Sequence, residues 1–295
     1  MIRNSIENSK LCLSWDNEGV SDVESIIDRK GATKAANIPE QVLNLLNLGE
    51  IESVNLTEWL AVDQRVLLKK VLPAAGLSEH LDDLLFKLEV ANMMNGMKAI
   101  RMIGENLYEI LQKVDGETAD QTFSLLANHR SDSVRCWAAF IVGSTMDVEV
   151  KELLVKIRKF VADHHFGVRE IAWMAVREAL AKELEISIKL LKEWTNDSNE
   201  NIRRFAVESI RPRGVWCKHI ERLKKEPQTA LPILEQVKSD ESKYVQDSVG
   251  NWLNDASKTQ PEWVLSVCDE WEKVSDTKET KRIVKKAKRT IMKNR

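Results

Sequence analysis

Apolar residues recur at helical spacing in four similar segments of the second half of the chain. Each segment begins its pattern with a β-branched residue. A small or short aliphatic residue follows four positions later, and a third aliphatic residue follows four positions after that. The three columns are Val134, Val168, Ile202 and Val245; Ala138, Ala172, Ala206 and Val249; and Val142, Val176, Ile210 and Leu253. Positions four apart lie on one face of a helix. The pattern therefore predicts four helices with one buried stripe each, and the small middle residue lets a neighbouring helix approach closely.

The four stripes repeat at intervals of 34, 34 and 43 residues. Partner helices with helical apolar spacing are predicted at Val148–Val161, Lys182–Trp194 and Pro261–Val274, and Pro261 suits a first helical turn. Asp197 and Asn199 supply turn and N-cap chemistry before one of the second helices. Helix pairs with this period predict an all-α fold, a right-handed α-solenoid of HEAT-like pairs with a concave face.

The first half of the chain has weaker repeat character. Pro39–Leu72, Leu81–Lys113 and Glu117–Asn128 also have helical spacing, whereas residues 1–35 are polar and irregular. We expect residues 1–35 to form an irregular N-terminal arm and residues 36–295 to form a single repeat domain.

The long third interval contains an insertion directly after one of the predicted helices. Its sequence is Arg211-Pro-Arg-Gly-Val-Trp216. Pro212 ends the helix and Gly214 permits a turn, so we expect Trp216 to be presented from a loop. Insertions in solenoids tend to lie on one face, often the face that binds a ligand.

Polar residues gather on the other side of the second helices, which we expect to be exposed and concave. Two columns between the apolar stripes hold Cys136, Glu170, Arg204 and Asp247, then Phe140, Met174, Glu208 and Asn251. Beyond them lie Arg177, Glu178, Arg211, Asn254 and Asp255. A further column holds the arginines Arg135, Arg169 and Arg203.

Each polar candidate also has a purely structural interpretation. Glu208 is spaced to pair with Arg204 or Arg211 within its own helix, and Asp255 is placed to cap or turn the chain. Trp173, Trp194 and Trp252 lie on apolar faces and fit a core. Arg211 and Arg213 suit phosphate, carboxylate or neighbouring acids as partners.

Composition narrows the class of protein. Eleven Gly and six Pro in 295 residues fit a helical chain with tight connections and exclude collagen-like or typical all-β folds. The cysteines, Cys12, Cys136, Cys217 and Cys268, are scattered without metal-ligand spacing, so we expect reduced and mostly buried thiols. His164 and His165 are too close in sequence to share a metal. Catalytic triads, P-loops and dinucleotide fingerprints are absent, as is any stretch long and apolar enough for a membrane span.

The charge of the chain is segregated. Residues 281–295 contain eight basic residues and no acidic one, while the other 280 residues contain 36 basic and 46 acidic. The overall net charge of −2 therefore conceals a basic end, which is able to bind phosphate or simply to form a solvated terminal helix.

The stretch from Phe166 to Lys258 resembles the DNA alkylation repair family of HEAT-like glycosylases, the AlkC/AlkD group. The resemblance rests on Val168-Arg-Glu-Ile-Ala-Trp173, Asn201-Ile-Arg-Arg-Phe-Ala-Val-Glu208, the Arg-Pro-Arg-Gly-Val-Trp insertion, and Tyr244-Val-Gln-Asp-Ser-Val-Gly-Asn-Trp-Leu-Asn-Asp255. The Arg-Pro-Arg and Leu-Asn-Asp elements look like the AlkC branch, without its immunoglobulin-like domain.

The resemblance implies a monofunctional alkylpurine DNA glycosylase. Such an enzyme excises cationic N-alkylated bases such as 3-methyladenine, with 3-methylcytosine and 7-methylguanine left open, without flipping the base into a pocket. The family's two active-site acids and its aromatic residue fall on Glu208, Asp255 and Trp216, and Glu170 stands in for a third acid that here aligns near Trp173. The residues expected to contact DNA are Arg135, Arg169, Arg203, Arg211, Arg213, Trp173, Asn251, Asn254 and Lys258.

The resemblance also implies partners and location. We expect a monomer that binds double-stranded DNA containing alkylated bases in the bacterial cytoplasm or nucleoid, with no membrane partner, cofactor or metal. Two alternatives remain open. One is a non-catalytic HEAT-repeat protein that binds damaged or branched DNA, and the other is a HEAT scaffold for a protein partner.

Overall fold

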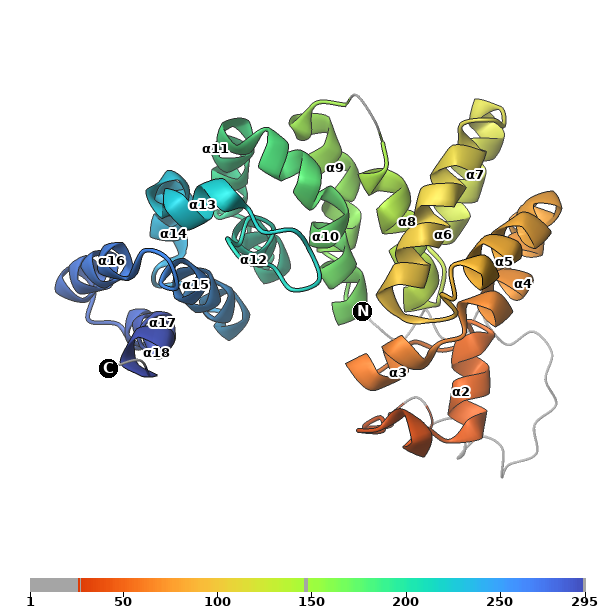
Figure 1. Cartoon of the computed structure of the whole chain (residues 1–295), viewed down its shortest axis with the longest axis horizontal. Coiled ribbons are helices and arrows are strands. Elements are labelled where there is room, and N and C mark those ends of the chain that lie inside the picture. The colour runs from red at the N-terminus through yellow and green to blue at the C-terminus, as the bar shows by residue number, and fades with distance from the viewer. Residues whose placement is uncertain (1–25, 27, 146–147, 294–295) are drawn as a thin grey trace.

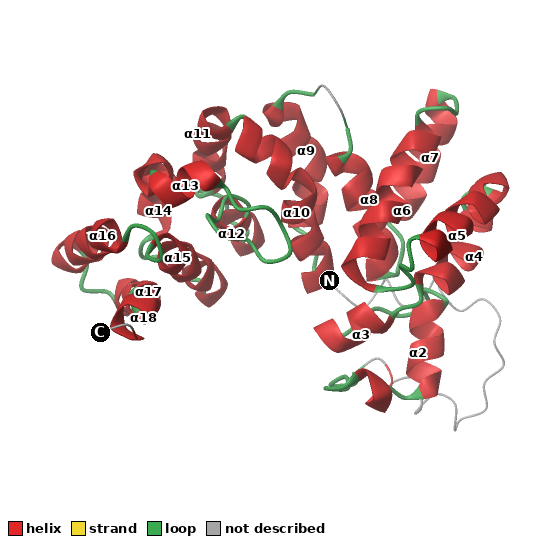
Figure 2. Cartoon of the chain, in the orientation of Figure 1, coloured by secondary structure: helices red, strands yellow, loops and turns green. Residues whose placement is uncertain are grey.

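The computed structural model describes residues 26, 28–145 and 148–293. Within these ranges every regular element is a helix, as Figure 2 shows. The helices form an arch that opens downward in Figure 1, with the N-terminal helices at one foot and the C-terminal helices at the other. The predicted all-α, HEAT-like solenoid is confirmed. Most of the expected arm, including Cys12, lies outside the described residues.

The first half contains shorter helices than the apolar spacing predicts. The expected helix over 39–72 is three helices, α2 (Glu40–Asn47), α3 (Leu56–Ala61) and α4 (Gln64–Ala74), and the next is α5 (Leu81–Val90) and α6 (Gly96–Leu111). The short η2 (Ala35–Asn37) precedes α2, and η3 (Ser78–His80) precedes α5. Gly49 and Gly76, with φ of +71° and +76°, directly follow the C-cap residues of α2 and α4, in the left-handed conformation that glycine adopts most readily. α7 (Gly116–Ala127) matches its prediction.

The second half follows the predicted helix pairs closely. The second helices are α8 (Asp132–Gly143), α10 (Phe166–Lys182), α12 (Glu200–Glu208), α15 (Lys243–Ala256) and α17 (Lys278–Ala287). Their outer partners include α9 (Val150–Val161), α11 (Leu184–Trp194) and α16 (Pro261–Val274), and α18 (Arg289–Lys293) ends the described chain. Figure 1 shows the second helices, with α6, along the inner side of the arch and the partners along its outer side.

The predicted stripes are the core. All twelve residues of the three apolar columns are at most 4% exposed. Outside these columns, α8 and α10 pack so closely that a side chain at Gly143 would lie 2.4 Å from the carbonyl oxygen of Ala175. One buried apolar cluster extends from Ile26 to Ile291.

The outer side of one repeat is irregular. Between α12 and α15 the chain forms α13 (Glu221–Lys225), η4 (Pro227–Ala230), α14 (Leu231–Leu234) and η5 (Glu235–Val237). Pro227 and Pro232 each lack a backbone N–H, which breaks a continuous helix here. The inserted sequence forms a loop, residues 209–220, that crosses in front of α10 and α12 in Figure 1.

The columns expected to face solvent are partly buried, which corrects that expectation. Cys136 is fully buried, and Phe140, Arg204 and Glu208 are 4–8% exposed. The reason is that each inner helix packs against inner neighbours on both sides as well as against its outer partner. A narrow strip of each inner helix is therefore left for the concave face.

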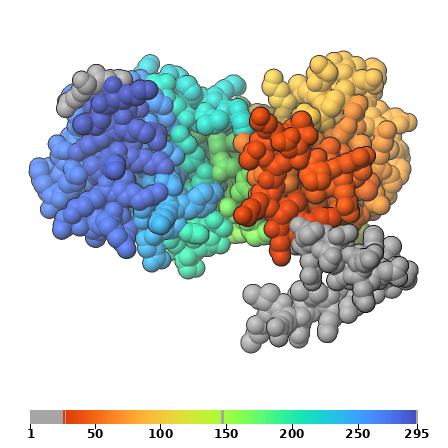
Figure 3. Space-filling view, turned by 90° about the horizontal axis from the view of Figure 1, so that it is seen from below, coloured from red at the N-terminus to blue at the C-terminus, as the bar shows by residue number. Residues whose placement is uncertain are grey.

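The concave side lies between the two feet of the arch. Figure 3 views it from below, with the N-terminal part in red and orange on one side and the C-terminal part in blue on the other. The middle repeats lie between them, so a long ligand placed across this side would meet both ends of the chain.

Candidate functional site

Six charged side chains form a continuous chain across the inner helices α10, α12 and α15, which we call the charge chain. Acid and base alternate along it in the order Glu170, Arg204, Glu208, Arg211, Asp255 and Lys258. The nitrogen–oxygen distances are 2.7, 3.7, 2.7, 2.6 and 2.9 Å in that order. Three repeats thus contribute to one electrostatic unit.

Arg211 lies between the two central carboxylates. Its Nη1 donates to Glu208, while Nε and Nη2 donate to the same oxygen of Asp255, at 3.0 and 2.6 Å. Glu208 and Asp255 are each 4% exposed. Ser248 adds a hydroxyl hydrogen bond of 2.5 Å to Glu208. Two buried acids therefore hold one guanidinium, which is the kind of pairing that buried charge requires.

The charge chain keeps Glu208 ionised. Burial alone would raise the pKa of Glu208, but the charges of Arg204 and Arg211 and the hydroxyl of Ser248 outweigh burial and lower it. Burial likewise works against the charged form of Arg211, and Glu208 and Asp255 raise its pKa overall. Glu208 is consequently an anion at neutral pH and is available to stabilise positive charge.

This lowered pKa predicts a pH-dependent effect of Glu208→Gln. A carboxyl whose folded-state pKa is depressed stabilises the fold above its unfolded pKa and loses that contribution as pH falls through the folded value. We expect the difference in unfolding free energy between wild type and Glu208→Gln to be constant near neutrality and to shrink once pH falls below the ordinary value of 4.5. Urea unfolding followed by circular dichroism from pH 7 to pH 3 measures this. A difference that stays constant over the whole range would contradict it.

The loop that carries Trp216 is held by Arg177, a residue whose anchoring role the sequence pattern did not reveal. Arg177 is 2% exposed, and its guanidinium donates to the backbone carbonyls of Ser209, Arg211 and Lys218. Its position directly after the buried Val176 was the available signal, since an arginine there is buried only when backbone oxygens satisfy it. Arg213 lies in the same loop, and its buried Nε has no hydrogen-bond partner among the described residues.

Trp216 is presented from this loop as predicted. It is 57% exposed and has a φ of +59°, which is unusual for a residue with a side chain. It lines two adjoining cavities of about 880 and 560 Å³, which are bounded by α6, α8, α10 and the loop. The lining of these two cavities does not include Glu208 or Asp255, so the structure does not bring the aromatic ring and the acids into one pocket.

Glu170, the substitute acid, belongs to the charge chain and is partly exposed. Its two oxygens accept from Arg204 and from the indole nitrogen of Trp173, the latter at 2.8 Å. Trp173 itself is 2% exposed and its ring is packed in the core, so in this conformation it offers almost no surface to the expected DNA. Arg177 lies over that ring.

The arginines of the column make extensive contacts within the protein. In Arg135, Arg169 and Arg203 alike, Nη1 donates to the carbonyl oxygens five and six residues earlier, in the loop before its own helix. Arg135 also pairs with Asp163, and Arg203 pairs with Asp240, each acid belonging to the next repeat. In this conformation these two arginines therefore join neighbouring repeats.

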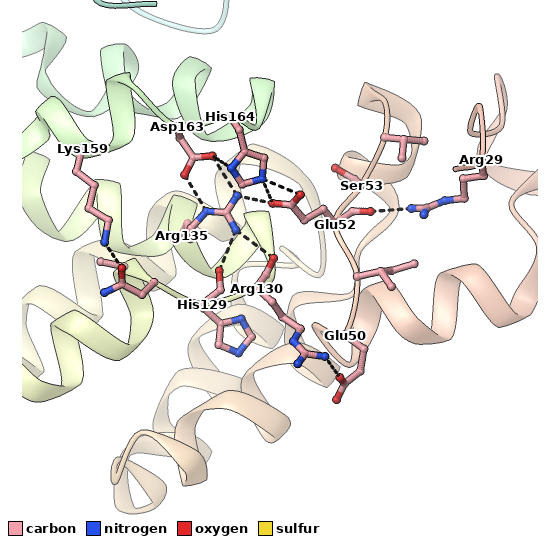
Figure 4. A pocket seen from close by; sticks show the side chains of 14 residues that line it. Arg29, Glu50, Glu52, Ser53, His129, Arg130, Arg135, Lys159, Asp163 and His164 are labelled. Carbon is pink, nitrogen blue, oxygen red and sulfur yellow. Dashed lines mark hydrogen bonds and ion pairs between the residues drawn. The ribbon is translucent and has the colours of Figure 1, made fainter. Parts of the chain in front are cut away.

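Arg135 has the most enclosed of these environments, shown in Figure 4. Its side chain is 7% exposed and contacts Asp163 at 2.8 Å and Glu52 at 2.5 Å. Glu52 also pairs with His164. Burial would lower the pKa of Arg135, but the hydrogen bonds that it donates to Asp163 and Glu52 raise it well above its ordinary value. The two acids tie the loop before α3 to α8 and to the loop before α10.

The remaining predicted DNA contacts divide into two groups. Asn254 is 3% exposed and accepts from the backbone N–H and hydroxyl of Thr290, so it anchors α18 and is buried away from solvent. Arg169, Asn251 and Lys258 retain exposure on or beside the inner face. Arg169 differs from its two equivalents because its guanidinium lies over the ring of Tyr244, 5.4 Å from the ring centre.

Metal-ligand clusters and membrane-spanning helices were sought among the described residues. Within the described ranges no three His, Cys, Asp or Glu side chains cluster as metal ligands, and no helix there is long and apolar enough to cross a membrane. Cys136, Cys217 and Cys268 are free thiols, the first and last buried, and burial raises the pKa of Cys268 to about 12.

Residues 168–288 match the family described as DNA alkylation repair enzyme. The uncharacterized protein YhaZ of Bacillus subtilis (strain 168) is 44% identical over 119 residues, which are 40% of this chain and 33% of YhaZ. The chain thus spans about a third of that relative. The resemblance detected in the repeat sequences is confirmed for this C-terminal part.

Two solved structures share the fold. The alkylpurine DNA glycosylase AlkC of Pseudomonas fluorescens, solved bound to DNA containing an abasic site analog, has a TM-score of 0.65 at 24% identity, covering 89% of this chain and 66% of that one. AlkD2 of Streptococcus mutans has a TM-score of 0.54 at 26% identity, covering 70% and 97%. At these identities the likeness establishes a common solenoid architecture.

Proposed function

We propose that this protein, whose residues 168–288 match the DNA alkylation repair enzyme family, is a DNA glycosylase that releases cationic N-alkylated bases such as 3-methyladenine. The observation that carries the proposal is the pair of buried carboxylates, Glu208 and Asp255, with one guanidinium between them. The site is thus built to stabilise a single compact positive charge. Hydrolysis of a cationic nucleotide passes through such a charge.

The reaction needs electrostatic help more than acid catalysis. When the N-glycosidic bond of an N-alkylated base breaks, its electron pair leaves with the base and cancels the base's charge. Positive charge then develops on the deoxyribose ring. Fixed anions at this position lower the barrier because they act in a site already shielded from water. The attacking water bonds to C1′ and transfers a proton to a carboxylate, which completes the hydrolysis.

Arg211 covers the two acids in the free protein. For the reaction to proceed, the positively charged deoxyribose must replace the guanidinium of Arg211 beside Glu208 and Asp255. In the described conformation its guanidinium fills the space between Glu208 and Asp255. A DNA phosphate offers Arg211 an alternative bidentate partner. Once the guanidinium turns toward phosphate, the sugar cation takes its place beside the acids. Glu170, which holds Arg204, is the third acid of the same unit.

DNA reaches the charge chain along the concave face. The basic end of the chain contributes Lys281, Lys285, Arg289 and Lys293, all exposed on α17 and α18. Arg282 and Lys286 of α17 share Asp247 on the inner helix α15. Phosphate contacts supply affinity without sequence selection, so this basic end positions the duplex. The lesion is then recognised by the positive charge of the alkylated base. Trp216 adds an aromatic contact from the loop that also carries Arg211.

Base release from methylated duplex DNA tests the proposal. Purified protein is incubated with duplex DNA treated with a methylating agent, and the released bases are identified by chromatography. We expect free 3-methyladenine, with 3-methylcytosine and 7-methylguanine measured in the same run. Release no greater than that by the Glu208→Gln variant would favour the non-catalytic DNA-binding alternative. Binding that does not weaken with salt would favour a protein scaffold.

A further inference from the structure

The smaller cavity beside Trp216, which we call the Trp216 pocket, has no role in the proposed chemistry. It measures about 560 Å³ and is formed by the turn before α6, by α6, α8 and α10, and by the loop 209–220. Its apolar wall is made of thioethers and aromatic rings, with Met93, Met97, Phe140, Met174 and Trp216 prominent. Sites of this volume and lining are typical of small organic ligands.

Cations and amides accompany this apolar wall. Lys98 and Arg101 of α6 line the pocket and are exposed, as is Asn95 at the start of the helix. Arg101 lies over the ring of Phe140, 5.9 Å from its centre, and pairs with Glu105 on its own helix. A ligand that fits must therefore combine a flat apolar surface with negative charge.

The indole of Trp216 is held ready for such a ligand. The left-handed backbone of Trp216 and the anchoring of its loop by Arg177 fix where the ring emerges. Its exposed surface and the sulfur atoms beside it suit stacking, since every nucleobase has a π-face and methionine adapts to the shape it meets. Among the described tryptophans it is the only one in the exposed class.

We propose that the Trp216 pocket binds one unstacked nucleotide, with its base against Trp216 and the methionines and its phosphate near Lys98 and Arg101. This inference rests on the proposed function only in that DNA supplies the nucleotide. The residues that line the Trp216 pocket do not include Glu208 or Asp255, so bond cleavage takes place at another nucleotide than the one bound in this pocket. The pocket instead holds the strand open beside the reacting nucleotide and fixes its register.

Titration of the full-length protein with deoxyadenosine 5′-monophosphate tests this proposal through tryptophan fluorescence. We expect saturable quenching, and the part of the signal that Trp216→Phe removes is assigned to the indole of Trp216. Because stacking and phosphate contacts both contribute, Met97→Ala and Lys98→Ala should each raise the dissociation constant at least about fivefold. Met102→Ala is the matched control: it removes a partly buried methionine from the same helix, outside the pocket lining, and should leave binding unchanged.

Two competing probes identify the source of any signal. Inorganic phosphate that quenches as well as the nucleotide would overturn the proposal in favour of a simple anion surface. Quenching by a medium-chain alcohol but not by the nucleotide would overturn it in favour of an apolar partner segment. Absence of saturable quenching up to the solubility limit of the nucleotide would also overturn it.

The outcome is separable from that of the base-release experiment. If methylated bases are released but the nucleotide does not bind, the pocket assignment fails and the glycosylase proposal stands. If the nucleotide binds and Met97→Ala weakens it but no base is released, the pocket assignment stands without the glycosylase. Each proposal thus has its own deciding measurement.

Discussion

Glu208→Gln combined with Asp255→Asn will lower the rate of 3-methyladenine release by about 100- to 1,000-fold, the range observed when one preorganised electrostatic contact to a transition state is removed. Both changes keep shape but remove the negative charges that face the sugar cation. Single-turnover release from methylated duplex DNA is the measurement. Excess enzyme isolates the chemical step from product release.

Binding must be measured alongside the rate. The acids are buried under Arg211 and do not face phosphate, so we expect affinity for an abasic-analog duplex to stay within about threefold of wild type, since affinity comes mainly from phosphate contacts. Removing the negative charges of Glu208 and Asp255 favours binding of the DNA polyanion. Weaker DNA binding therefore cannot explain a slower release of 3-methyladenine. Parallel losses of affinity and rate would instead assign Glu208 and Asp255 a structural role.

Exposed acids of the outer helices provide the matched controls. Glu221→Gln and Asp269→Asn remove ion-paired carboxylates from α13 and α16, where Glu221 pairs with Lys224 and Asp269 with Lys288. Surface pairs of this kind contribute little to stability because water screens the two charges. These variants should release bases at the wild-type rate. Full activity in the Glu208→Gln, Asp255→Asn protein would remove these acids from the mechanism.

Arg135→Ala will destabilise the fold by about 3–5 kcal/mol, the usual cost of removing one partner from a buried ion pair. The change takes from the buried Asp163 its guanidinium partner, leaving it the backbone N–H of His165 and the ring of His164, and it also removes hydrogen bonds to the carbonyls of His129 and Arg130. Urea unfolding at neutral pH measures the effect. Because Glu52 loses a partner too, the loop before α3 should exchange its amide hydrogens faster.

The same variant separates a structural arginine from a DNA contact. At a temperature where Arg135→Ala remains folded, its affinity for duplex DNA and its salt dependence should match the wild type. Arg130→Ala is the control for stability, since Arg130 is 64% exposed, pairs with Glu50 and should contribute at most about 1 kcal/mol. Reduced salt dependence together with unchanged stability would instead place Arg135 on the DNA.

Chemically alike residues in one sequence column have different surroundings here. Arg135 and Arg203 each meet an acid of the next repeat, whereas Arg169 lies over Tyr244. The column predicts that the three side chains recur along the stack, and they do. It does not predict their partners, because Asp163, Asp240 and Tyr244 lie outside the column and are brought to the arginines by packing between repeats.

The sequence by itself determined the helical repeat, because buried stripes at intervals of four and a period near 34 residues are properties of neighbouring positions along one chain. It also marked the loop before Trp216, since proline and glycine act on their own backbone. Only the tertiary structure decided which polar groups meet. Glu208 and Asp255 lie 47 positions apart, and Arg211 joins them because α12 packs against α15. Because the two carboxylates and the guanidinium are buried, water cannot hydrogen-bond to them. They therefore pair with each other.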